Sequence, residues 1–310
     1  MTPSSLPESF QKKVRIPFMR QRWSFASVSI FFIAISFYSF FTKGFNFGVD
    51  FKGGVKLVYQ FKQETNEGDL RKLLTESGVE SQIVRYGKEN ENTFLFKIKE
   101  DEKENYSAKL SAVLQKNFDN PTLLSEDNIK ARAGKDLRQR GIFAIILTCV
   151  CILFYVGWRF DFLFAPGAIL ALAHDVIISL GAFSFFQKEV DLSILAAILT
   201  IIGYSVNDTI VIYDRIRENI KKLPSSLRMT DLIDISMNEM LGRTIVTSLT
   251  VLFSVTVLYL FGGKVIHDFA FCMIVGVIAG VYSTVFIASP IYIALQKFFP
   301  DKGLQRTTKK

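Results

Sequence analysis

Six long apolar runs constrain the fold of this chain of 310 residues more than any other feature. An α-helix needs roughly 20 apolar residues to cross a bilayer. The runs are Trp23–Phe41, Ile142–Trp158, Phe162–Phe186, Leu192–Tyr213, Ile245–Phe261 and Phe269–Leu295. The first is too long for the apolar part of a signal peptide and lacks a small-x-small cleavage site before Gly44. The sequence therefore predicts a polytopic α-helical membrane protein with six transmembrane helices, the first an uncleaved anchor.

The distribution of lysine and arginine predicts the orientation of these helices. Basic residues gather in the segments 1–22, 214–243 and 297–310, whereas the loops around Lys188 and Lys264 carry one basic residue each. Basic loops stay on the cytoplasmic side of a membrane. Both termini are therefore expected in the cytoplasm. The same segments account for the net charge of +8, so no nucleic-acid partner is predicted.

Residues 55–133 alternate between strand-like and helix-like patterns. The expected order is strand Val55–Phe61, helix Glu67–Ser77, strands Ser81–Tyr86 and Thr93–Lys99, helix Lys103–Phe118 and a last strand over Asn128–Ala133. The order β-α-β-β-α-β is that of a ferredoxin-like α+β domain. The expected organisation is a cytoplasmic tail (1–22), transmembrane helix 1 (23–43), one extracytoplasmic α+β domain (44–138), a five-helix transmembrane bundle (139–298) and a cytoplasmic tail (299–310).

The sequence offers no set of residues for catalysis. Residues 44–138 contain neither cysteine nor histidine, and the three cysteines, Cys149, Cys151 and Cys272, lie in predicted spans where small apolar packing residues are the better interpretation. The glycine-rich stretch 44–54 lacks the GxxxxGK[ST] pattern of a phosphate-binding loop. No enzyme activity, cofactor or metal site is predicted.

Asp208 is the most unusual residue, because it lies within a predicted membrane span. Insertion of an aspartate at the centre of a membrane helix costs about 2.5 to 3.5 kcal/mol. One interpretation is a titrating group in a proton or ion path, and the other is a carboxylate that only makes hydrogen bonds between helices.

Two further charged residues in the spans leave similar alternatives open. Asp175 lies on a face of small and polar residues spaced 3 or 4 apart, so it is expected to point into the bundle. It is either a helix–helix hydrogen-bonding group or part of an ion path. Arg243 begins a polar stripe that continues with Thr247, Thr250 and Ser254. It either finds partners inside the bundle, Asp208 among them, or extends to the cytoplasmic surface.

Five segments resemble a known family. They are GVDFKGG at 48–54, ALAHD at 171–175, IGYSVNDTIVIYDRIREN at 202–219, LGRTIVTS at 241–248 and YLFGG at 259–263. The chain resembles, over essentially its whole length, the SecF proteins of the SecD/SecF protein-export family, relatives of the resistance-nodulation-division transporters. The resemblance implies that Asp208 and Arg243 serve proton transport, with Asn207 beside Asp208 and Asp175 as a further candidate. It also implies that Asp50, Gly53, Gly54 and Gly203 are motif residues with a structural role.

The resemblance further implies an accessory subunit of the Sec translocase in the bacterial cytoplasmic (inner) membrane. Such a subunit uses the proton motive force with SecD to complete export of polypeptides. The implied partners are SecD, the SecYEG channel, a YajC-type accessory subunit, the unfolded exported polypeptide and the membrane. A proton gradient could act through the helices. Protonation of Asp208 would change helix packing, and the connections 44–54 and 133–141 would transmit that change to the outer domain. The alternative function is a passive assembly factor that stabilises the translocon. A small-molecule efflux subunit fits less well, since such pumps carry two large outer domains.

Overall fold

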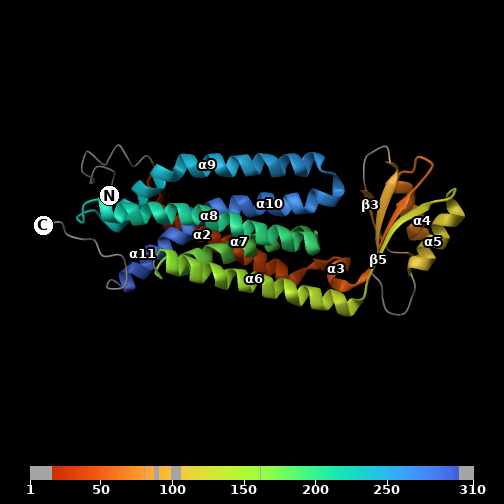
Figure 1. Ribbon diagram of the computed structural model, residues 1–310, viewed down its shortest axis with the longest axis horizontal. Coiled ribbons are helices and arrows are strands. Elements are labelled where there is room, and N and C mark those ends of the chain that lie inside the picture. Colours follow the sequence, from red (N-terminus) through yellow and green to blue (C-terminus); the bar gives the residue numbers. More distant parts are fainter. Residues whose placement is uncertain (1–15, 80, 87–90, 99–105, 161, 300–310) are drawn as a thin grey trace.

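The computed structural model describes residues 16–79, 81–86, 91–98, 106–160 and 162–299. Within this part of the chain, a long helical bundle carries a small α+β domain at one end (Figure 1). The first and the last described residues lie at the opposite end of the bundle, called here the far end. Most of the predicted N-terminal tail and nearly all of the C-terminal tail lie outside the described residues.

Six helical segments of the described chain are long and apolar enough to cross a membrane, which confirms the predicted number. They are α2 (Arg22–Thr42), α6 (Ala131–Arg159), α7 (Ala165–Phe186), α8 (Leu192–Lys222), α9 (Met229–Phe261) and the continuous run of α10 (Gly263–Ser283), the π-helical turn η4 (Thr284–Ala288) and α11 (Ser289–Phe298). A 3-10 turn, η2 (Phe18–Arg20), precedes α2. The helices α8 and α9 extend beyond their apolar runs and form most of the basic segment 214–243 at the far end.

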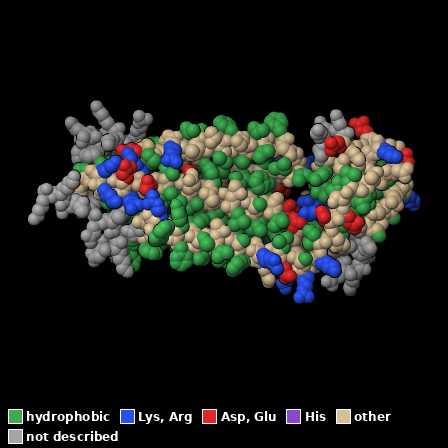
Figure 2. Space-filling view, in the orientation of Figure 1, with side chains coloured by type: hydrophobic (Ala, Val, Ile, Leu, Met, Phe, Trp, Pro, Cys, Tyr) green, Lys and Arg blue, Asp and Glu red, His purple; other side chains and the backbone are tan. Residues whose placement is uncertain are grey.

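Apolar side chains cover the flank of the bundle that Figure 2 shows, whereas charged side chains gather at the far end and where the α+β domain meets the helices. The α8 and α10 helices are the most buried. Their close contact depends on glycine: a Cβ atom at Gly276 would lie 2.2 Å from Cδ1 of Ile201, and one at Gly280 would lie 3.1 Å from Cβ of Ser205. Small residues allow membrane helices to approach in this way.

The α+β domain has the predicted order of elements. Its strands are β2 (Gly54–Gln60), β3 (Ser81–Tyr86), β4 (Thr93–Ile98) and β5 (Thr122–Ile129), and its helices are α4 (Glu67–Glu76) and α5 (Tyr106–Asn117). The strands form an antiparallel sheet in the order β3-β4-β2-β5. One face packs on α4 and α5 through a core that includes Leu57, Phe96, Leu70 and Leu114. The last strand begins earlier than expected, and α6 already starts at Ala131, where the sequence predicted an extended end.

A short connection joins α2 to the sheet and contacts the bundle on its way. It contains β1 (Asn46–Phe47) and the single turn α3 (Val49–Lys52). The strand β1 pairs in parallel with β6 (Glu189–Val190), in the loop before α8, a pairing the sequence did not predict. Gly53 has a φ of 92° and Gly54 a φ of 142°, values that side chains disfavour, so these glycines turn the chain from α3 into β2.

Candidate functional site

The α8 helix is the centre of the candidate site. Its buried face carries Ser205, Asp208 and Thr209, and it packs against α7, α9 and α10. Its first turn is capped by Asp191, whose Oδ1 accepts hydrogen bonds from the backbone N–H groups of Ser193 and Ile194. Such a cap satisfies N–H groups that have no partner within the helix.

Asp175 lies between α7, α8 and α10 and is fully buried. Its Oδ2 accepts hydrogen bonds from the hydroxyl groups of Ser205 (2.6 Å) and Ser283 (2.9 Å). Its Oδ1 lies 3.0 Å from Nδ1 of His174, whose ring stacks on Tyr282. His174, the preceding residue of α7, is therefore a direct neighbour of the Asp175 carboxyl group. Polar partners therefore surround this carboxylate on both oxygens.

Asp208, four helical turns into α8, is almost fully buried but has fewer partners. Its Oδ2 makes no hydrogen bond among the residues that the structure describes. The hydroxyl of Ser248 lies within hydrogen-bonding reach of the carboxyl group, and Arg243 acts on it through its charge. Ser248 in turn accepts a hydrogen bond from the hydroxyl of Tyr204 at 3.1 Å. A buried oxygen without a partner costs free energy, which distinguishes Asp208 from Asp175.

Arg243 lies beside a cavity of about 330 Å³ at the far end of the bundle. The cavity is lined by residues of α6, α8 and α9, among them Tyr155, Arg159, Asp214 and Arg215. Arg215 is held by Glu239 at 2.7 Å and by Glu218. Arg243 makes no direct ion pair with Asp208, and its side chain is exposed on the outside of α9. Of the two alternatives left open by the sequence, Arg243 therefore extends to the surface and is not enclosed in the bundle, although its charge still acts on Asp208.

Asn207 and Gly203 lie on the other side of α8, away from Asp208. Both are exposed, and a Cβ atom added at Gly203 would meet nothing within 4 Å. Together with Ala196 and Thr200 they form an exposed strip of small and polar residues, called here the α8 strip. The structure therefore places Asn207 next to Asp208 in sequence but on a different face.

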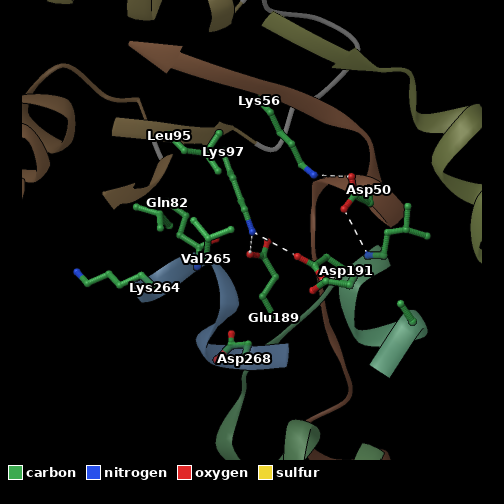
Figure 3. A pocket seen from close by; sticks show the side chains of 14 residues that line it. Asp50, Lys56, Gln82, Leu95, Lys97, Glu189, Asp191, Lys264, Val265 and Asp268 are labelled. Carbon is green, nitrogen blue, oxygen red and sulfur yellow. Dashed lines mark hydrogen bonds and ion pairs between the residues drawn. The ribbon is translucent and has the colours of Figure 1, made fainter. Parts of the chain in front are cut away.

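The motif residue Asp50 belongs to a second polar site, at the α+β end of the bundle (Figure 3). Its Oδ1 accepts a hydrogen bond from Nζ of Lys56 at 2.7 Å, and its Oδ2 accepts a long one, 3.4 Å, from the backbone N–H of Leu192. Nearby, Nζ of Lys97 lies 2.9 Å from Oε2 of Glu189 and 3.6 Å from Oδ2 of Asp191. These five charged residues (Asp50, Lys56, Lys97, Glu189 and Asp191) are called here the junction cluster, and they line a cavity of about 450 Å³.

The charges of the junction cluster hold Lys97 in its protonated form. Burial of Lys97 works against its charge, but Glu189, Asp191 and Asp50 outweigh that effect and raise its pKa. A second ion pair joins the same two parts of the protein, between Lys264 at the start of α10 and Glu67 at the start of α4. Partial burial of Glu67 opposes ionisation, but Lys264 and Arg71 lower its pKa below the ordinary value.

No local pattern in the sequence distinguishes Lys97, Glu189 or Asp191 from other charged residues. Among the described residues, no group of three or more His, Cys, Asp or Glu side chains is arranged to hold a metal ion.

Comparison with known families agrees with this architecture. Residues 109–298 match the family model described as protein export membrane protein SecD/SecF, C-terminal. Residues 38–65, which include Asp50 and the two glycines of the turn, match the model described as SecD/SecF GG motif. The chain belongs to the SecD/SecF family. It is a multi-pass membrane protein of the SecF type, from a family of protein translocase subunits.

The similar proteins include translocase subunits SecF from several bacteria. The SecF of Desulfurispirillum indicum is 38% identical, over 95% of this chain and 96% of its own length. The SecF of Haemophilus influenzae is 39% identical, over 93% and 86% respectively. The crystal structure of SecDF from Thermus thermophilus, described as a translocon-associated membrane protein, superposes with a TM-score of 0.76 at 33% identity. The match covers 91% of this chain and 39% of that longer SecDF chain, so the chain corresponds to a part of SecDF.

Proposed function

We propose that this chain uses the proton motive force, together with a SecD partner, to complete export of polypeptides through the SecYEG channel. Asp208 is the proton-carrying group and Arg243 controls its charge. The observation that supports this most is the carboxyl group of Asp208, which is buried but has one oxygen without a hydrogen-bond partner in the described chain. A carboxylate with only a structural role in helix packing would be expected to satisfy both oxygens, as Asp175 does.

The chemistry follows from the surroundings of Asp208. Burial favours the neutral carboxylic acid, whereas a nearby guanidinium group favours the carboxylate. A movement of Arg243 toward or away from Asp208 therefore releases or binds a proton. Arg243 lies on the exposed side of α9 and makes no direct ion pair with Asp208. The distance between its guanidinium group and the Asp208 carboxyl group can therefore change. Each proton that crosses supplies about 2.3 kcal/mol per 100 mV of membrane potential.

The surface of the bundle supports a membrane partner. The α8 strip and the exposed charge of Arg243 would be costly against lipid, since a charge in the hydrocarbon costs several kcal/mol. A SecD-type helix packed on the α8 strip would cover both, and the small residues would allow close approach. SecYEG, a YajC-type subunit and the exported polypeptide complete the proposed set of partners.

The proposed orientation places the far end in the cytoplasm of the cell and the α+β domain outside the inner membrane. The first and the last described residues lie at the far end (Figure 1). The basic residues Arg159, Arg215, Arg217 and Arg243 are found there too. The cavity beside Arg243 then opens toward the cytoplasm and offers protons a way out.

The experiment uses vesicles that contain this chain, its SecD partner and the channel. Gradient-stimulated completion of export is compared between the wild type and Asp208→Asn, and the assembly of the complex is checked by pull-down. We expect Asp208→Asn to abolish the stimulation with assembly intact. Asp231→Asn is the matched control, because it removes a carboxylate near the start of α9 that pairs with Arg228, away from Asp208. Undiminished stimulation in Asp208→Asn would leave the passive assembly factor as the better function.

A further inference from the structure

The junction cluster connects the α+β domain to one particular membrane helix. Two covalent connections already join the domain to the bundle, from α2 through α3 and from β5 into α6. The junction cluster adds a contact to the loop between α7 and α8, more than 90 residues from Lys97 along the chain. This contact lies at the first residues of α8, the helix that carries Asp208.

Lys97 contributes the contact from the middle of the sheet. It lies on β4, which is hydrogen-bonded to β2 on one side and β3 on the other. Its side chain is only 13% exposed and reaches both Glu189 and Asp191. A pair at this position transmits a displacement to the sheet as a whole, because the central strands are held on both sides.

Asp191 contributes the contact from the helix. Its Oδ1 caps α8 through Ser193 and Ile194, while its Oδ2 faces Lys97. One carboxylate thus holds the first turn of the helix and the central strand of the sheet. Asp50 repeats the arrangement less tightly, since it bridges Lys56 on β2 and the backbone N–H of Leu192.

The distance from Asp208 to this contact lies along a single helix. Sixteen residues of α-helix separate Leu192 from Asp208, which is about 24 Å at 1.5 Å per residue. A regular helix moves as a stiff unit, so a shift or rotation of α8 at Asp208 reaches Asp191. The connections 44–54 and 133–141, expected from the sequence to transmit movement, continue from α2 and into α6, and 44–54 also pairs with the loop before α8 through β1 and β6.

We propose that Lys97, through its ion pairs with Asp191 and Glu189, is the positioning residue that couples the protonation of Asp208 to the α+β domain. The inference rests on the proposed function of Asp208. An ion pair that only stabilises the fold would not affect this coupling. Without Lys97 and Asp191, in contrast, the α+β domain should no longer respond when protonation of Asp208 shifts or rotates α8. The domain itself remains folded, since its core on α4 and α5 does not include Lys97.

The test measures backbone hydrogen exchange of the sheet in vesicles that contain this chain and its SecD partner. The response is the change in exchange of β2 and β4 amides that Asp208→Asn produces. We expect a response of between about twofold and thirtyfold, the range of coupling found between linked sites. In a Lys97→Met background the response should vanish, and in a Lys97→Arg background it should return, because the charge is kept.

Lys264→Met is the matched control. It removes another ion pair between the same two parts of the protein, with Glu67, but that pair connects to α10 instead of α8. The response should survive in this variant. Where Lys97→Met prevents assembly, Asp191→Asn takes its place: asparagine caps a helix as well as aspartate does but carries no charge.

Equal responses in the wild type and Lys97→Met would overturn the proposal, and so would the absence of any response in the wild type. The export assay tests the proposed function of Asp208 independently of the hydrogen-exchange experiment. Loss of export in Asp208→Asn with an unchanged exchange pattern would reject the role of Lys97 and keep the proposed function, whereas normal export in Asp208→Asn would reject the proposed function itself.

Discussion

Two aspartates lie in the same helical bundle, yet their carboxyl groups have opposite surroundings. Asp175 has hydroxyl partners on one oxygen and a histidine ring on the other. Asp208 has an oxygen without a partner among the described residues and the charge of Arg243 at a distance. A fully satisfied buried group stabilises one arrangement of helices, whereas an unsatisfied one is poised to change with its protonation. On this comparison we propose a structural role for Asp175 and a role in proton transfer for Asp208.

The largest expected effect is on export. Asp208→Asn should lower gradient-stimulated export at least about tenfold, since the loss of a proton-transferring group removes the step itself. Asp175→Asn should lower it less, because an amide oxygen still accepts the hydrogen bonds of Ser205 and Ser283. The vesicle assay described above measures both. A larger loss in Asp175→Asn than in Asp208→Asn would exchange the two roles.

Stability should show the reverse order. Asp175→Ala removes the acceptor of the buried Ser205 hydroxyl and the polar partner of the His174 ring, while the Ser283 hydroxyl keeps only its bond to the carbonyl of Gly280. Each buried unsatisfied group costs about 1 to 3 kcal/mol. We expect the free energy of unfolding to fall by about 3 kcal/mol. Asp208→Ala should change it by less than about 1 kcal/mol, because few partners are lost. Denaturation of the purified chain in detergent micelles measures the difference, and equal losses in the two variants would contradict the comparison.

The environment of Asp175 depends on how closely α8 and α10 pack. Gly276→Ala would place a Cβ atom against Ile201 and should cost about 1 to 3 kcal/mol of stability, the usual cost of overpacking. Ile201→Ala in the same chain should recover part of that loss, which a double-mutant cycle measures. Gly203→Ala is the control on the exposed side of α8, where the added Cβ meets nothing within 4 Å. It should leave the stability of the isolated chain unchanged or slightly higher. Additive effects of Gly276→Ala and Ile201→Ala would show that this contact does not limit the packing.

Much of this architecture could be predicted from local patterns. Run lengths near 20 apolar residues indicate membrane helices directly, and the alternation in residues 55–133 indicates the order of strands and helices. The strip that contains Asp175 was correctly placed inside the bundle, because small residues at spacings of 3 and 4 share a face.

Contacts between distant residues could not be predicted in this way. Because side chains alternate along β4, Lys97 lies on the face of the sheet opposite to that of Phe94 and Phe96. From the sequence alone, a lysine on that face is expected to point into solvent. Only the docking of the sheet on the bundle brings Lys97 to Asp191, so the junction cluster had no local signal. The sequence left two interpretations of Arg243 for the same reason. The stripe Thr247, Thr250 and Ser254 shows which face of the helix Arg243 lies on, but only the packing of the helices determines which neighbour that face contacts.

The smallest expected effect concerns the second ion pair between domain and bundle, and it sharpens the contrast with Lys97. Lys264 and Arg71 lower the pKa of Glu67, so the pair stabilises the folded protein at pH values above the ordinary glutamate pKa and is lost as the pH falls through the lowered one. The side chain of Lys264 is 57% exposed, so Glu67→Gln should cost less than about 1 kcal/mol at neutral pH. The difference from the wild type should start to shrink as the pH falls below the ordinary glutamate pKa and should disappear below the lowered one. It should also shrink in concentrated salt. Thermal denaturation across pH and salt measures this, and a loss that persists at low pH would show that Glu67 acts through packing and not through its charge.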